Sequence, residues 1–184
     1  MKRAAFALLF VVVLAAGDAR AEGNTLCTGE FALCTSAACV PMPADPSKAI
    51  CFCDVKEGKS MSTVACNTIA PKTDENGIRT IYSMFALDQF ADGKRGMKCP
   101  SGTPWTWCLN KPCTVSQIDR TKALCTCDIV RKGEWMTLGG DCDTSTCKMG
   151  YWSAAPLKDF ESGNDFMTKA HGAKESPAKW CPEG

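Results

Sequence analysis

Fourteen cysteines in a chain of 184 residues constrain the fold more than any other feature of the sequence. Their number is even, and all of them follow the first 21 residues. Dense, even cysteine sets are typical of exported proteins in which disulfides supplement a small hydrophobic core. We therefore expect every cysteine to be paired in a small disulfide-rich fold: Cys27, Cys34, Cys39, Cys51, Cys53, Cys66, Cys99, Cys108, Cys113, Cys125, Cys127, Cys142, Cys147 and Cys181.

The first 21 residues contain the three parts of a secretory signal peptide. Lys2 and Arg3 form a basic start, residues 4–16 form an apolar run, and Ala19-Arg20-Ala21 supply the small residues of a cleavage site. The apolar run is short for a membrane span, and no later segment reaches the roughly 18 apolar residues that a span requires. The sequence thus predicts an exported chain, periplasmic or extracellular, without a membrane span.

Charge and motif content exclude several classes of function. The chain carries 21 basic and 20 acidic residues, whereas a nucleic-acid-binding protein concentrates positive charge. A single histidine, His171, rules out His-rich metal sites. A Ser-His-Asp or Cys-His catalytic site would have to use this residue, which lies in a polar tail. No phosphate-binding loop or dinucleotide motif is present. The sequence gives no positive sign of an enzyme, a cofactor or a nucleic-acid partner.

The spacing of the cysteines repeats along the chain. Four cysteines recur 74 positions later (108 − 34 = 74), and two more recur with shifts of 72 and 76. Residues 45–55 and 119–129 match around them, with Asp45 and Asp54 recurring as Asp119 and Asp128 in expected turn or strand-end roles. We infer a tandem duplication. The predicted organisation is a signal peptide at 1–21, a first repeat at 22–95, and a second repeat with a C-terminal extension at 96–184.

Each repeat is predicted to be a short antiparallel β-meander held by three disulfides, in a mainly β protein. Residues 39–43 are the expected first arm, confined to a sheet edge by their prolines. Residues 60–66 and 135–142 are the expected third arms. Between them lies a strand whose alternation places one set of residues on a single face: Ala49, Cys51, Cys53 and Val55, and in the second repeat Ala123, Cys125, Cys127 and Ile129.

Short helical segments are expected after each meander. Residues 81–91 have apolar residues at near-helical spacing, and residues 157–170 have a similar pattern that Gly163 interrupts. Cys147 and Cys181 have no counterpart in the first repeat, so we expect them to bridge to each other. The short linker at 92–96 leaves open whether the two repeats pack together or sit apart.

The two Cys-x-Cys motifs allow two interpretations. As free thiols, Cys51/Cys53 and Cys125/Cys127 would form redox pairs or bind a soft metal such as copper(I). As disulfides, they would tie one strand to its neighbours. The recurrence of the motif in the same context and the oxidising environment outside the cytoplasm favour disulfides without a metal. The alternative function is a thiol-redox or copper-binding protein.

The five tryptophans all lie in the second repeat. Trp135 and Trp180 do not replace an apolar residue of the first repeat, so on the surface they would stack on a sugar ring or an apolar partner. The favoured interpretation, however, is packing against the C-terminal extension. The remaining three replace large apolar residues and are expected in the core: Trp105, Trp107 and Trp152.

Together these features predict an exported, non-catalytic, disulfide-stabilised tandem-repeat protein that binds a protein or a surface glycan. Trp135 and Trp180 are the candidate binding residues. One form of this hypothesis is an inhibitor of a secreted hydrolase. It would present one of the two eleven-residue segments that lie between Cys39 and Cys51 and between Cys113 and Cys125.

Overall fold

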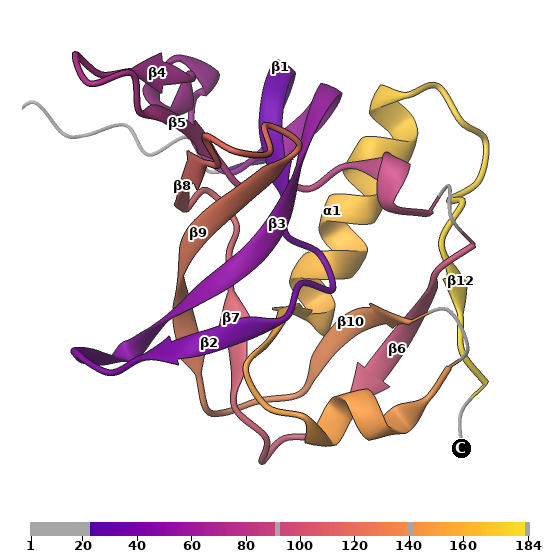
Figure 1. Ribbon diagram of the computed structural model, residues 1–184. Coiled ribbons are helices and arrows are strands. Elements are labelled where there is room, and N and C mark those ends of the chain that lie inside the picture. Colours follow the sequence, from indigo (N-terminus) through magenta and orange to yellow (C-terminus); the bar gives the residue numbers. More distant parts are fainter. Residues whose placement is uncertain (1–22, 91–92, 140–141, 183–184) are drawn as a thin grey trace, which may run out of the picture.

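The fold of the protein is given by a computed structural model that describes residues 23–90, 93–139 and 142–182 (Figure 1). The predicted signal peptide lies outside the described residues. In the described part the chain forms twelve strands and one α-helix, with short 3-10 helices between them. The mainly β fold expected from the sequence is confirmed.

Strands occur along the whole described chain, and the single α-helix of the described residues lies near the C-terminus. The elements in chain order are β1 (Thr25–Leu33), β2 (Cys39–Met42), β3 (Asp45–Ser62), η1 (Cys66–Ile69), β4 (Lys72–Thr73), β5 (Arg79–Tyr82), η2 (Leu87–Phe90), β6 (Arg95–Cys99), β7 (Trp105–Trp107), β8 (Pro112–Val115), β9 (Lys122–Val130), β10 (Trp135–Gly139), η3 (Thr144–Lys148), β11 (Trp152–Pro156), α1 (Leu157–Ala170) and β12 (Lys179–Trp180).

The long strand β3 organises the first half of the chain. β2 pairs antiparallel with its first part, and β1 pairs antiparallel with its second part as far as Ser62. The expected hairpin between residues 39–43 and 48–55 is confirmed, and the proline-containing β2 pairs only with β3 among the described strands. The third arm expected at residues 60–66 is wrong. Residues 60–62 continue β3, because the nine-residue β1 supplies a partner along that whole length.

Strand β9 has the same role in the second half. β8 pairs with its first part and β7 with its last three residues. A separate strand, β10, does follow where the third arm was expected, but it pairs with β6 and β11 instead of β9. The meander predicted for this half is therefore incorrect in its pairing, because β6 and the C-terminal extension provide the partners of β10.

The two central strands join the halves. β3 and β9 pair antiparallel over residues 48–54 and 122–128, with Cys51 opposite Cys125 and Phe52 opposite Leu124. Figure 1 shows the two strands side by side at the front of the molecule. One hydrogen-bonded sheet thus contains strands from both halves, so the halves pack together and do not sit apart.

Ion pairs close both ends of this strand pairing. Asp128 accepts a hydrogen bond from Lys48, and its other oxygen lies 2.5 Å from Lys111 Nζ. At the opposite end Lys122 Nζ lies 2.6 Å from Asp54 Oδ1. Burial by itself would raise the pKa of Asp128, but the hydrogen bonds from Lys111 and Lys48 together hold that pKa below its usual value. Both aspartates have a structural role at the ends of the β3–β9 pairing, as expected, but Asp54 itself lies inside the long strand β3 and not at a strand end.

All fourteen cysteines are in disulfides, as expected. The three bridges of the first half stay within it, and two bridges of the second half have the same separations of 19 and 12 residues as their counterparts. The pairs are Cys27–Cys66, Cys34–Cys53, Cys39–Cys51, Cys99–Cys147, Cys108–Cys127, Cys113–Cys125 and Cys142–Cys181.

The expected Cys147–Cys181 bridge is wrong. η3 packs against β6, which places Cys147 beside Cys99 at the end of that strand. The C-terminal strand β12 pairs parallel with the other end of β6, and Cys181 there reaches Cys142. The position of the extension along β6 therefore decides the pairing.

Four disulfides from both halves form one sulfur core beneath β3 and β9. The Sγ atoms of Cys34 and Cys125 are 3.2 Å apart, and those of Cys108 and Cys51 are 3.5 Å apart, so each bridge touches one of the other half. The predicted one-sided faces are confirmed for the first three residues of each, which are buried: Ala49, Cys51 and Cys53 of β3, and Ala123, Cys125 and Cys127 of β9. The fourth residues of the two faces, Val55 and Ile129, are only half-buried. Each of these bridges lies within one half, so the halves are held together here by close packing of the sulfur atoms and by the β3–β9 pairing, not by a covalent bond.

The helix α1 covers a second apolar cluster behind the sheet. Phe160 and Met167 of α1 pack there with Met61 of β3 and Met136 of β10. The helix expected at residues 157–170 is confirmed, but the interruption at Gly163 is wrong. A Cβ at that glycine would stand 3.0 Å from the Met61 methyl group, so the missing side chain lets the helix approach β3 closely.

The helix expected at residues 81–91 is present only as the short η2. The residues before it stay extended, and the backbones of Phe85 and Met61 form a β-bridge. Phe85 and Phe90 both pack edge-on against Phe160 at 5.7 and 6.1 Å. The spacing of these two phenylalanines therefore reflects their shared contact with α1, and it does not indicate that they lie on one helix. In the described part of the chain, no helix combines the length and apolar character needed to cross a membrane.

Disulfide mapping tests the connectivity directly. We expect proteolysis without reductant, followed by mass spectrometry, to yield linked peptides containing Cys99–Cys147 and Cys142–Cys181. Alkylation in denaturant without reductant should add no mass, since no cysteine is free. A linked Cys147–Cys181 peptide, or several alkyl adducts, would contradict the structure.

The ion pairs predict how stability depends on pH. The folded pKa of Asp128 is lowered, so its contribution is present above the unfolded pKa of about 3.9 and is lost as pH falls through the folded pKa. We expect Asp128→Asn to reduce the free energy of unfolding at pH 7 by about 0.5–1 kcal/mol, the range for partly exposed pairs, and to have little effect at low pH.

Denaturant unfolding with the disulfides intact, at pH 7 and at about pH 2, measures this difference. Asp54→Asn is the matched control, since among the described residues Asp54 forms an ion pair with Lys122 only, and it is more exposed. An equal loss in Asp128→Asn at both pH values would show that the carboxylate charge has no part in the stabilisation.

Candidate functional site

The loop between β8 and β9 presents an isoleucine entirely to solvent. Ile118 is 100% exposed at the tip of residues 116–121, between polar neighbours on both sides. A large aliphatic side chain with no contact to its own protein gains nothing from folding. Its counterpart in the first half (118 − 74 = 44) is Ala44, so the feature belongs to one half only.

Internal hydrogen bonds hold this loop in one conformation. Ser116 Oγ accepts from the backbone N–H groups of Ile118 (3.3 Å) and Asp119 (3.1 Å). Asp119 Oδ1 in turn accepts from the Thr121 hydroxyl at 2.6 Å and from its N–H at 3.0 Å, which lowers the pKa of Asp119. The turn role expected for Asp119 is confirmed, and Asp45 bonds Ser47 in the same way.

Covalent and backbone links anchor the base of the loop to the sheet. The Cys113–Cys125 disulfide joins β8 to β9 below it, and the N–H of Ser116 donates to the Lys122 carbonyl at 2.9 Å. The Thr121 carbonyl accepts from the N–H of Val55 on β3 at 2.8 Å. Ile118 is therefore displayed on a loop that is fixed to both central strands.

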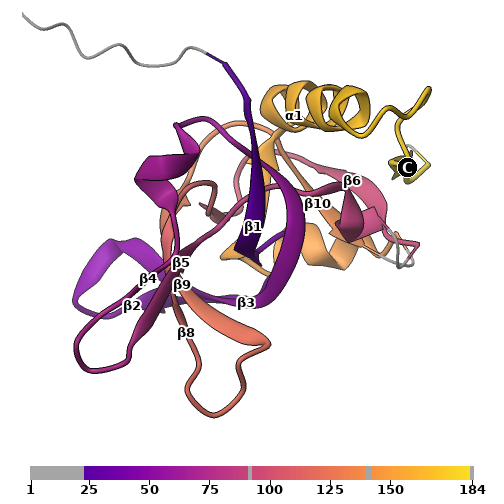
Figure 2. The ribbon, with the colours of Figure 1, turned by 90° about the horizontal axis from the view of Figure 1, so that it is seen from above.

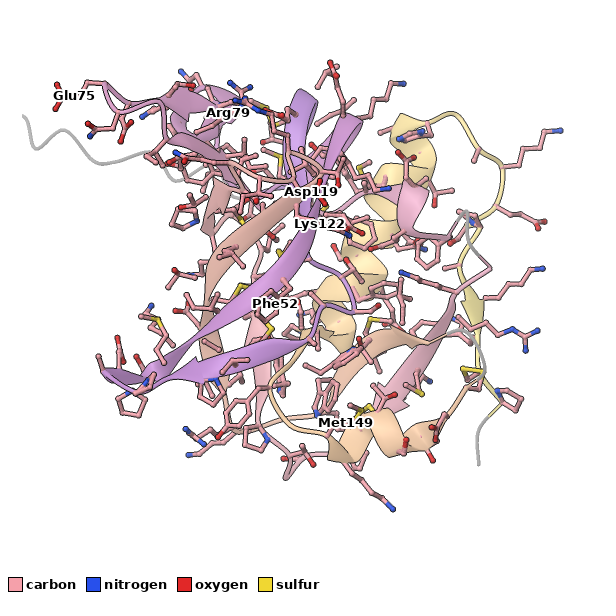
Figure 3. All side chains as sticks on the ribbon, in the orientation of Figure 1. Phe52, Glu75, Arg79, Asp119, Lys122 and Met149 are labelled. Atoms are coloured by element: carbon pink, nitrogen blue, oxygen red, sulfur yellow. A yellow bond between two sulfur atoms is a disulfide. The ribbon has the colours of Figure 1, made fainter. Side chains whose placement is uncertain are left out.

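An apolar sheet face lies beside the loop. Phe52 is 57% exposed, and its register partner Leu124 is 46% exposed, on the side of β3 and β9 opposite the sulfur core. Val40 on β2 is also exposed, and it stands opposite Ile50 of β3. We call Ile118 and these four residues the hairpin face. Figure 3 shows Phe52 on the front of the sheet, with Asp119 and Lys122 above it.

The hairpin face has a charged border and lies away from the helix. The Lys48–Asp128 and Lys122–Asp54 pairs stand at the two ends of the strand segment that carries Phe52. Figure 2, seen from above, shows the β8–β9 loop projecting on the opposite side of the molecule from α1. An apolar centre with a polar rim is the usual composition of a protein–protein interface.

The two tryptophans expected at a binding surface have different environments. Trp135 is only 1% exposed and stacks on Trp105 at 6.4 Å, so the surface position expected for it is wrong. It is buried because β10 lies between β6 and β11. Trp180 is 38% exposed, but its ring packs edge-on against Phe160 at 5.6 Å and carries Lys98 Nζ 5.4 Å from its centre.

The Cys-x-Cys motifs provide no free thiol. Cys51, Cys53, Cys125 and Cys127 are each in a disulfide and are at most 1% exposed. Sulfur atoms do approach one another within 4.8 Å in the core, as in the group of Cys34, Cys53 and Cys125. They are bonded in pairs, however, and a thiolate is the form that binds metal or attacks a disulfide. The thiol alternative would require reduction of this buried core.

Sequence reasoning pointed to the segment between Cys113 and Cys125 as a displayed loop, but it did not single out Ile118. The sequence does contain a sign of its exposure, because Ile118 is a lone apolar residue between the polar pairs Ser116-Gln117 and Asp119-Arg120. Exposure of Phe52 and Leu124 was implied by the alternation that buried their neighbours. Comparison of the chain with protein-family models, with curated proteins and with solved structures finds no match.

Proposed function

We propose that the protein is an exported, non-catalytic binding protein that docks a partner protein through the hairpin face. The full exposure of Ile118 on a loop fixed by the Cys113–Cys125 disulfide carries this proposal. The seven disulfides are typical of exported proteins and agree with the predicted signal peptide. The compartment, periplasmic or extracellular, remains part of the proposal.

Rigidity favours binding at this loop. A flexible loop loses conformational entropy when a partner fixes it, at roughly 0.5–1.5 kcal/mol for each ordered side chain. The hydrogen bonds of Ser116 and Asp119 order the loop already in the free protein, so binding loses less conformational entropy. A single β-branched side chain on a fixed loop suits a partner with an apolar recess, such as the substrate pocket of a secreted hydrolase.

The surface chemistry favours a protein over a glycan as the partner. Sugar binding typically uses an open aromatic ring beside polar groups, whereas the ring of Trp180, although 38% exposed, already contacts Lys98 and Phe160. The hairpin face instead offers aliphatic side chains and one phenylalanine inside a border of ion pairs. This composition suits an apolar protein surface.

We also propose that the two halves arose by duplication. The β3–β9 register supports this, because counterpart residues Cys51 and Cys125 stand opposite each other. The ion pairs at the two ends exchange under the same local two-fold rotation. After duplication, a substitution at this one position would explain why the loop of the second half presents Ile118, whereas the corresponding turn of the first half has Ala44.

Photo-crosslinking from position 118 tests the docking surface. A benzophenone amino acid would replace Ile118 in the protein exported by its own host, with Met149, 62% exposed elsewhere, as the matched position. We expect a discrete covalent adduct with one exported protein from position 118 and none from position 149. Absence of an adduct at 118, or the same adducts at both positions, would contradict the proposal.

Affinity for the crosslinked partner then tests the role of the side chain. We expect Ile118→Asp to weaken binding by about 2 kcal/mol, roughly thirtyfold, because a charge would replace an anchoring aliphatic group. Ala44→Asp places the same charge on the corresponding loop of the first half and should leave the affinity unchanged. Equal dissociation constants for the two variants, measured by calorimetry, would exclude Ile118 as an anchor.

A further inference from the structure

A cavity of about 240 Å³ lies between the sheet and α1, and none of the hairpin-face residues lines it. Its walls come from both halves of the chain: Met61, Met84 and Phe85 from the first, and Trp107, Met136 and Phe160 from the second. A cavity of roughly 150 Å³ with apolar walls accommodates benzene. This one has room for a single ring with a short chain and is too small for most drug-sized molecules.

The walls of the cavity suit an aromatic ring. Methionine sulfur atoms make favourable contacts with ring edges, and three methionines, at positions 61, 84 and 136, contribute to the lining. Phe85 and Phe160 stand edge-to-face at 5.7 Å and add an aromatic wall. Met136 and Phe160 are almost completely buried and form the floor of the cavity, whereas the half-buried Phe85, Trp107 and Leu109 present their surface to it. Serine and threonine residues, such as Thr63 and Ser153, also belong to the lining.

One charged group accompanies these apolar walls. Asp159 is the only charged residue among the described residues that line the cavity. It belongs to the first turn of α1 and is itself exposed, which places its carboxylate where the cavity meets solvent. A ligand whose ring enters the apolar part would direct its chain toward this carboxylate, which attracts a cation and repels an anion.

We propose that the cavity binds a small arylalkylamine, with its ring against Phe85, Trp107 and Leu109, over the floor of Met61, Met136 and Phe160, and its ammonium group at Asp159. The site is separate from the hairpin face, so it would add a small-molecule ligand to a protein-binding function. Neither proposal depends on the other. Because residues of both halves line the cavity, it exists only when the two halves are packed together.

Methyl NMR with three isosteric probes tests this proposal on the whole folded protein. Titration of the protein, labelled at its methionine methyl groups, would use 2-phenylethylamine, 2-phenylethanol and phenylacetate in turn. We expect ring-induced shifts at Met61, Met84 and Met136. The buried Met97, which lies outside the lining and packs in a different cluster, serves as the internal control. The amine should bind about fivefold more tightly than the alcohol, and the carboxylate least tightly.

Asp159→Asn provides the matched variant, because it removes the charge and keeps the shape. We expect it to abolish the preference for the amine and to leave the affinity for 2-phenylethanol unchanged. Three results would overturn the proposal: no shift at the three lining methionines, a shift of equal size at Met97, or an amine preference that survives in Asp159→Asn. Since Ile118 has no part in the titration, failure here leaves the hairpin-face proposal intact.

Discussion

Contact between disulfides of the two halves is the constraint on which the rest of the structure depends. Cys34 touches Cys125 and Cys108 touches Cys51, so four covalent bridges pack as one unit beneath β3 and β9. A sheet of two or three short strands buries too little apolar surface to be stable alone. The sulfur core supplies that surface for both halves together, and it fixes the strands that carry the hairpin face.

Local features of this architecture were readable from the sequence. Alternation placed Cys51 and Cys53 on a buried face and their neighbour Phe52 on the opposite one, because side-chain direction in a strand depends only on position along it. Cysteines close in sequence were tied by adjacent strands, and aspartates before Ser47 and Thr121 formed the expected turns. These outcomes follow from a few neighbouring residues.

Features that depend on distant segments were not predictable in the same way. The pairing of Cys142 with Cys181 follows from the position of β12 along β6, which no spacing reveals. Gly163 looks like a helix breaker in isolation, but it allows α1 to approach Met61. The cavity was equally hidden, since its lining is assembled from both halves and α1. The burial of Trp135 likewise results from strands that flank it on both sides.

Two surfaces on opposite sides of one rigid sheet suggest a division of roles. The front of β3 and β9, with the Ile118 loop, is fixed by covalent links and turn hydrogen bonds, and it is chemically suited to a protein partner. The back is covered by α1, whose contacts leave an apolar cavity with one carboxylate at its entrance. Both depend on the sulfur core, because it holds the two central strands in register.

Hydrogen exchange with the disulfides intact tests the central claim most directly. If the sulfur core joins the halves, amides in residues 48–54 and 122–128 should be the most slowly exchanging in the protein and should exchange at a common rate, since both segments open only together. Clearly different rates in the two segments, or fast exchange in either, would show that the halves open independently and would contradict a shared core.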